Sequence, residues 1–207
     1  MKKTRLIVLA LVGFMAAPLH ADFFGPANGR TANMDNMSDM SVEVGINLKS
    51  NFNTFGGRFN YKISPDVVVF ADVGQSNWFG SSSLTYGLGA YYQLRNVTLL
   101  ENTDFAVKGS YHGGSFDVCD AFFDFGGCSV SASELAIEGL ISGDQLATTD
   151  FAWYANLGLH IIDVGVSDTN FGLGGGIVGD AGPGQWYAGI DIIDQFFLVG
   201  GYRYNIQ

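Results

Sequence analysis

The chain has 207 residues with 20 acidic and 10 basic side chains, so its formal net charge at pH 7 is −10. Nucleic acid is not an expected partner, because a phosphate backbone requires a basic protein surface. Charged residues make up only 14% of the chain, against about 25% in soluble domains. The composition therefore argues against an ordinary water-soluble surface.

The N-terminus has the parts of a secretory signal peptide. The first five residues carry two lysines and an arginine, residues 6–17 are apolar but too short to span a bilayer, and a cleavage site follows Ala21. We therefore expect export, with a signal peptide over residues 1–21. Removing the three signal bases leaves seven bases against 20 acids, a mature net charge of −13.

Residues 22–40 are polar and lack periodicity, so we expect a mobile N-terminal leader. The methionines of the mature chain, Met34, Met37 and Met40, all lie here. Thioethers at this spacing could hold Cu(I). A chance cluster in a flexible segment is the simpler interpretation, and we predict no metal site and no cofactor.

From residue 41 onward apolar and polar residues alternate with a period of two, broken by turn residues. The pattern predicts ten strands, over residues 41–49, 54–63, 67–74, 84–94, 104–112, 132–142, 151–162, 170–178, 185–193 and 195–206. The sixth of these, ASELAIEGLIS, could also form a short helix. No linker divides residues 41–207, which we interpret as one all-β domain.

Two architectures share this alternation. A soluble sandwich or lipocalin-like barrel buries the apolar face, whereas a transmembrane barrel turns it to lipid and lines its lumen with the polar face. The polar positions are mostly Gly, Asn, Ser, Thr and Gln, and their charges balance, as an enclosed lumen requires. The bases are Lys49, Arg58, Lys62, Lys108 and Arg203, and the acids are Glu43, Asp72, Glu134, Glu138 and Asp191.

Aromatic residues on the apolar face gather toward strand ends, where interfacial girdles lie. They are Tyr61, Tyr92, Trp153, Trp186, Tyr202 and Tyr204. Tilted strands of about ten residues match the hydrocarbon thickness, and closure pairs every backbone group. We predict a closed antiparallel transmembrane β-barrel, with ten strands preferred and eight as the alternative.

A cleavable signal, alternating strands and a last strand with spaced Tyr202 and Tyr204 resemble the small outer-membrane β-barrel proteins of Gram-negative bacteria. This class includes the transmembrane domain of outer membrane protein A and its OmpX- and OmpW-like relatives. The resemblance implies a place in the cell outer membrane, contact with its lipid and lipopolysaccharide, and insertion by the barrel-assembly machinery. Members usually end in Phe, whereas this chain ends in Ile206 and Gln207.

Segment 113–131 is the longest predicted outer connection and so the best place for a surface function. Cys119 and Cys128 favour a disulfide here, because the chain is exported and no His or Cys set completes a zinc site. The loop could bind an extracellular receptor or cation-bridged lipopolysaccharide, or could pack over the barrel mouth. Its aromatic and acidic residues are Phe116, Asp117, Asp120, Phe122, Phe123, Asp124 and Phe125.

One set of residues suggests catalysis. Ser110, His112 and Glu134 lie on polar-face positions near the outer ends of adjacent strands, and such a group could form an activated nucleophile if the side chains met. A hydrogen-bonded lumen network is the simpler interpretation, and it covers His160 as well. We predict no enzyme, with a lipid A-modifying activity as a remote alternative.

Two functions from different classes remain. One is a structural or surface-interaction barrel whose lumen is blocked by Arg58, Lys62, Glu138, Asp191 and Arg203. The other is a narrow porin-like channel for small solutes. Small barrels usually fill their interior with side chains, which favours the first. Glycines on the polar face keep the second open, namely Gly87, Gly89, Gly172, Gly174, Gly176, Gly189 and Gly201.

Overall fold

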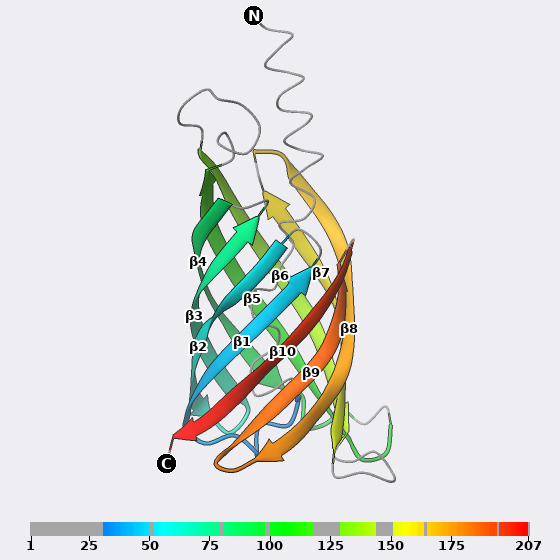
Figure 1. Ribbon diagram of the computed structural model, residues 1–207. Coiled ribbons are helices and arrows are strands. Elements are labelled where there is room, and N and C mark those ends of the chain that lie inside the picture. Colours follow the sequence, from blue (N-terminus) through cyan, green and yellow to red (C-terminus); the bar gives the residue numbers. More distant parts are fainter. Residues whose placement is uncertain are drawn as a thin grey trace, which may run out of the picture.

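The computed structural model describes residues 31–49, 52–78, 81–97, 100–117, 129–143, 151–163, 165–193 and 195–206. Ten antiparallel strands close into one barrel, because β1 pairs with both β2 and β10 (Figure 1). The strands are β1 (Met40–Lys49), β2 (Phe52–Ser64), β3 (Val67–Trp78), β4 (Ser81–Gln93), β5 (Thr103–Asp117), β6 (Ser129–Gly143), β7 (Ala152–Asp163), β8 (Ser167–Ala181), β9 (Gly184–Ile193) and β10 (Gln195–Ile206). The preferred ten strands are confirmed.

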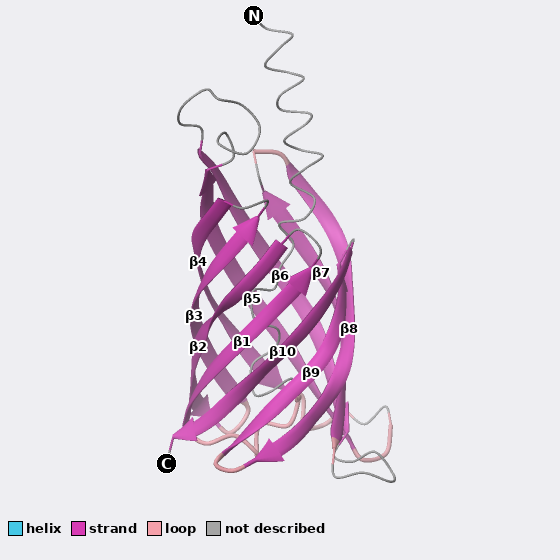
Figure 2. Ribbon diagram, viewed as in Figure 1, coloured by secondary structure: helices cyan, strands magenta, loops and turns pink. Residues whose placement is uncertain are grey.

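Most strands are longer than predicted, although β10 has its predicted bounds. Segment 132–142 lies within β6, so its helical alternative is wrong, as the coloring by secondary structure also shows (Figure 2). Pairing of β5 with β6 continues to Asp117 and Ser129, which shortens the predicted outer connection and places Phe116 and Asp117 in a strand. The remaining predicted loop residues lie outside the described residues, namely Cys119, Asp120, Phe122, Phe123, Asp124, Phe125 and Cys128. The described residues contain no helix that is long and apolar enough to cross a membrane.

The side chains follow the predicted alternation, with apolar residues outside and polar residues inside. In β1, Val44 is 52% exposed whereas its neighbour Glu43 is 1% exposed. On β8, Phe171 also points outward and is 74% exposed. Large apolar side chains cover the outer surface on all ten strands, and such a surface suits hydrocarbon rather than water.

Aromatic side chains ring one end of the barrel, here called the base, where β1 begins and β10 ends. Tyr92 and Tyr204 are about half exposed there. Trp153 lies opposite Gly143 on β6, where an added Cβ would come within 2.3 Å of the indole nitrogen. The indole ring therefore covers the backbone that the glycine leaves bare, and the predicted girdle is present at the base.

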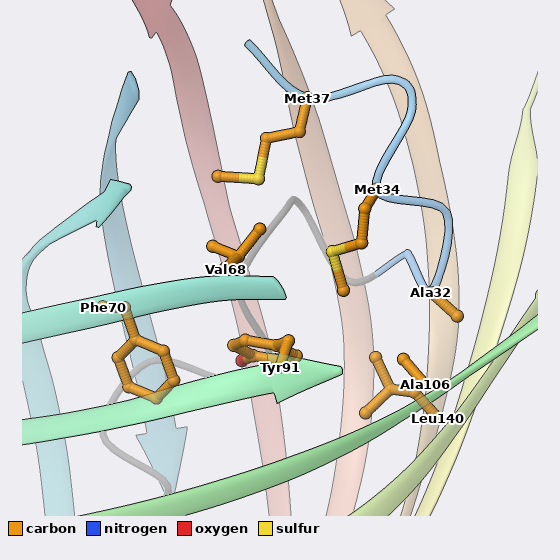
Figure 3. Packing of buried hydrophobic residues seen from close by; sticks show 8 residues of the cluster. All are labelled: Ala32, Met34, Met37, Val68, Phe70, Tyr91, Ala106 and Leu140. Carbon is orange, nitrogen blue, oxygen red and sulfur yellow. The ribbon is translucent and has the colours of Figure 1, made fainter. Parts of the chain in front are cut away.

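Residues 31–39, here called the inner segment, lie at the base and pack inside the barrel (Figures 1 and 3). They belong to the leader that we expected to be mobile. Ala32 and Met34 are fully buried and Met37 nearly so. The inner segment leads directly into β1 at Met40, where the Lys62 amide donates to the Asp39 carbonyl across 2.8 Å. A stretch without periodicity therefore fills part of the lumen.

Candidate functional site

The strand register aligns charges of alternating sign around one side of the lumen. Arg203 of β10 lies opposite Glu43 of β1, Glu43 lies opposite Arg58 of β2, and Arg58 lies opposite Asp72 of β3. All four side chains are buried. Directly opposed residues on neighbouring strands are the closest cross-strand neighbours, so the register itself balances the charge of the lumen wall.

Arg58 is the most fully engaged of these cations. Its Nε and Nη2 atoms donate to Asp72 Oδ2 at 3.1 and 2.8 Å. Nη1 donates to the Tyr91 hydroxyl at 3.3 Å, and the guanidinium carbon lies 4.0 Å from the centre of the Phe70 ring. An ion pair with additional hydrogen bonds and a cation–π contact holds Arg58 against the wall formed by β2, β3 and β4.

His112 reaches the same carboxylate across an intervening strand. Its Nε2 atom lies 3.3 Å from Asp72 Oδ2, although β4 separates β3 from β5. The residue between them on β4 is Gly87, where an added Cβ would lie 2.1 Å from the imidazole ring. This glycine therefore provides the space that the His112–Asp72 contact needs.

A second ion pair joins β5 and β6. Lys108 Nζ pairs with Glu138 Oε2, and both side chains are fully or nearly fully buried. Asn156 Nδ2 donates to the other oxygen of Glu138 at 3.1 Å. Gly158 leaves room for the Glu138 side chain, because a Cβ at that position would lie 2.4 Å from Glu138 Cγ.

The predicted blocking set is therefore divided among separate contacts. Lys62 Nζ donates to the Met34 carbonyl at 2.8 Å, and Arg203 Nη2 donates to Gln185 Oε1. Asp191 lies next to Gly174, where an added Cβ would come within 2.0 Å of its carboxylate. Arg203 and Asp191 thus lie against neighbouring strands, whereas Lys62 is bonded to the inner segment.

The catalytic candidates are directed to different partners. His112 contacts Asp72, while Glu134 Oε1 lies 2.6 Å from His160 Nδ1. The Ser110 hydroxyl has no hydrogen-bond partner among the described residues. A serine nucleophile needs a base within hydrogen-bond reach, and Ser110 does not have one in this arrangement.

The glycines that suggested an open channel do not leave free space in the lumen, because neighbouring side chains lie over them. An added Cβ at Gly176 or Gly189 would lie 2.4 or 1.8 Å from the Tyr154 hydroxyl. At Gly201 it would lie 2.4 Å from the Tyr187 hydroxyl. The space above these glycines on β8, β9 and β10 is thus filled by tyrosines from β7 and β9.

The inner segment is attached to the wall by a few polar contacts. The Ala32 amide donates to Ser142 Oγ at 2.8 Å, and the Met34 amide donates to Gln93 Oε1 at 2.9 Å. At the surface, Arg95 donates from both Nη atoms to the two carboxylate oxygens of Asp35, each at 2.8 Å. These bonds hold the pKa of Asp35 below its ordinary value of 3.8 and raise the pKa of Arg95.

Apolar side chains inside the base form the rest of the contact with the inner segment. Figure 3 shows the side chains of Met34 and Met37 directed toward apolar side chains of the barrel wall. The wall residues come from β3, β4, β5 and β6, and are Val68, Phe70, Tyr91, Ala106 and Leu140. Tyr154, Val178 and Tyr187 form another apolar cluster on β7, β8 and β9. Together these residues, here called the apolar collar, line the lumen near the base along β3 to β9, whereas β10, β1 and β2 carry buried polar or charged side chains there.

The apolar collar was missed because its members interrupt faces that are otherwise polar. Tyr91, for example, alternates in phase with Gly87, Gly89 and Gln93. Val68 and Phe70 lie in segment 67–74, where nearly every residue is apolar and the period of two is weak, although Asp72 still marks the polar face. The described residues contain no group of three or more His, Cys, Asp or Glu side chains that could hold a metal ion.

The fold has counterparts among solved structures. A KdgM porin aligns with a TM-score of 0.46 at 9% identity, covering 81% of this chain and 99% of that one. The N-terminal β-barrel domain of Pseudomonas aeruginosa OprF gives 0.40 at 12% identity, covering 81% and 98%. The translocator domain of the autotransporter NalP from Neisseria meningitidis gives 0.41 at 10% identity, covering 83% and 90%.

These similarities lie in the β-barrel architecture alone, and no function is transferred from them. No protein-family model and no curated protein matches the chain.

Proposed function

We propose that this protein is an outer-membrane β-barrel with a structural or surface-interaction role and a lumen that is closed at rest. The observation that carries the proposal is the path of the inner segment. It starts from β1 and makes contacts as far as Ser142 on β6, which lies five strands from β1 in a ring of ten. A segment that reaches the opposite strand obstructs passage through the base.

The electrostatics of the lumen support the same proposal. The guanidinium of Arg58 and the ammonium of Lys108 are buried and paired with carboxylates of neighbouring strands. In a wide aqueous pore such side chains would be hydrated and exposed. Their mutual neutralisation suits a packed interior, in which an unpaired charge would be costly.

The outer surface supports a place in the outer membrane, with lipid and lipopolysaccharide as its contacts. The described strands carry an apolar exterior with an aromatic ring at the base, and insertion would then depend on the barrel-assembly machinery. A surface role would fall to the connection between β5 and β6, at the end of the barrel away from the base. There an extracellular ligand could bind residues of segment 113–131.

The experiment that tests the proposal combines membrane fractionation with planar-bilayer recording of the refolded protein. We expect the protein in the outer-membrane fraction, a mobility on electrophoresis that changes on heating, and no steady single-channel steps. Steady conductance of the unmodified chain would contradict the closed lumen. A soluble monomer in the absence of detergent would contradict the membrane assignment.

We further propose that the barrel is not a lipid A-modifying enzyme, because Ser110 lacks a base within reach. The variant His112→Ala tests this. We expect the lipid A species of cells that express it to match those of cells that express the wild type. A species present only with the wild type would contradict the proposal.

A further inference from the structure

We propose that the inner segment is a displaceable plug, and that the barrel passes small uncharged solutes when this segment leaves the lumen. The inference goes beyond the structural or surface-interaction role proposed above, and it rests on the proposal that the lumen is closed at rest. It assigns an activity to the barrel, a means of opening and a class of solute.

The barrel does not need the inner segment for closure. Each strand is paired on both sides within the ring of ten, and β1 pairs with β10 from Met40 to Leu48. The inner segment is covalently continuous with this ring only through Met40. A movement about residues 38–39 would therefore withdraw it without breaking the pairing of any strand.

Among the described residues, most hydrogen bonds between the inner segment and the wall involve side chains. They include the bonds of Ser142 to Thr31 and Ala32 and of Gln93 and Lys62 to Met34, besides one backbone bond from Lys62 to Asp39. At the surface the ion pair of Asp35 with Arg95 is exposed to water, so it is weakened by solvent. A strand of similar length is held by two continuous ladders. The inner segment is thus held much less firmly than the wall against which it packs.

The residue types in the inner segment also allow it to move. Residues 31–39 include two asparagines, two aspartates and a serine, residues that favour turns over regular structure. The Asn33 amide donates to Thr31 and the Asp35 amide donates to Asn33, so its local bonds stay within the segment. These bonds can persist when the segment leaves the wall.

The apolar collar indicates the class of solute. Withdrawal of the inner segment would uncover Phe70, Tyr91 and Leu140 on β3, β4 and β6, and Tyr154 and Tyr187 continue this apolar lining on β7 and β9. A charged solute loses hydration on passing an apolar constriction, whereas an uncharged solute with a partly apolar surface loses much less. The charges beside these side chains are paired, Arg58 with Asp72 and Lys108 with Glu138. They offer no excess of either sign, so neither cations nor anions would be favoured.

A reversible crosslink tests the plug. The hydroxyl oxygens of Thr31 and Ser142 lie 3.2 Å apart, so Thr31→Cys with Ser142→Cys would allow a disulfide between the inner segment and β6. The pair is placed in a Cys119→Ser, Cys128→Ser background, so that reductant acts only on the new bond. The same purified protein is then compared in proteoliposomes before and after reduction.

The readout is osmotic swelling in methyl glucoside, gluconate or glucosamine, which are uncharged, anionic and cationic sugars. We expect the oxidised protein to be tight and the reduced protein to pass methyl glucoside faster than either charged sugar. Equal tightness in both states would overturn the plug while leaving the closed barrel intact. Equal leakage in both states would overturn the plug and the closed lumen together.

A single substitution keeps the test valid if the crosslinked protein does not fold. Asp35→Asn removes the charge that Arg95 binds, and Asp168→Asn, at an exposed position far from the base, is its matched control. We expect methyl glucoside entry to rise by up to about fivefold in Asp35→Asn, the range of one exposed ion pair, and not in the control. An equal rate in both folded variants would overturn the plug.

Discussion

The two sides of the lumen are filled by different physical means. On the side of β2 to β6, buried cations pair with carboxylates on neighbouring strands, as Arg58 does with Asp72 and Lys108 with Glu138. On the side of β7 to β10, Tyr154 and Tyr187 lie over glycines of β8, β9 and β10. The first side depends on charge neutrality and the second on close packing.

This difference shows that a polar alternation in sequence does not specify how a lumen is filled. Both sides alternate with the same period and present small or polar residues inward. On the first side, inward positions carry long charged side chains such as those of Arg58 and Lys108. On the second side, which also buries Asp191 and Arg203, inward glycines receive a tyrosine from the adjacent strand or, at Gly189, from two strands away. The two sides should therefore respond differently to substitution.

The largest effect is expected on the charged side, from Lys108→Met. It leaves the buried Glu138 carboxylate without its cation, and removal of one partner of a buried ion pair costs about 3–5 kcal/mol. The free energy of unfolding, measured by denaturant titration of protein refolded in vesicles, should fall by that amount. The double variant Lys108→Met, Glu138→Leu should recover most of the loss, because no charge is left unpaired.

A loss well below this range for the single variant would mean that water reaches Glu138. The charged side would then line an aqueous path, and the distinction between the two sides would fail. The same result would also contradict the closed lumen proposed above.

A smaller effect is expected on the glycine side, from Gly189→Ala. The new Cβ would lie 1.8 Å from the Tyr154 hydroxyl and 2.6 Å from the Gly175 carbonyl, and overpacking typically costs about 1–3 kcal/mol. Gly109→Ala is the matched control, because this outward glycine has no atom within 4 Å of an added Cβ. Equal stability of the two variants would contradict close packing on this side.

Removal of the tyrosine hydroxyl sharpens the comparison. Tyr154→Phe combined with Gly189→Ala should regain part of the lost stability, because the nearest clash is with the hydroxyl oxygen. It should not regain all of it, because the contact with the Gly175 carbonyl remains. No recovery would indicate that the backbone contact alone sets the cost.

Much of the fold could be predicted from the sequence, because alternation determines which residues share a face. It placed Glu43, Lys108 and Arg203 inside and Val44 and Phe171 outside, as the structure has them. The strand ends were less well predicted, since pairing of β5 with β6 extends through Ser115 and Phe116 without a clear apolar pattern. Backbone pairing of this kind leaves no periodic signal.

The inner segment and the detailed contacts of the lumen could not be predicted, for a different reason. Ala32 binds Ser142, which lies 110 residues away in sequence, and nothing in a polar, aperiodic stretch indicates such a partner. Likewise, alternation placed Asp72 and His112 in the lumen but not next to each other, because their contact depends on the space above Gly87. Long-range side-chain contacts require the register of several strands at once.

The smallest expected effect concerns the attachment of the inner segment at acid pH. Arg95 and, more distantly, Lys62 are the cations facing Asp35, while Asp66 is a second acid bound to Arg95. Because its hydrogen bonds with Arg95 hold the pKa of Asp35 below 3.8, the ion pair is intact above that value and is lost as the pH falls through the lowered pKa. Methyl glucoside entry should thus be constant from about pH 8 to 5, since a carboxyl group titrates well below this range, and should rise below 3.8.

The variant Asp35→Asn separates this group from the other titratable ones. It should start from a higher rate of entry and lose the part of the acid response that Asp35 contributes, whereas the control Asp168→Asn should keep all of it. A rise centred near neutral pH in both variants would instead assign the response to groups other than Asp35. The ion pair at the base would then not control the inner segment.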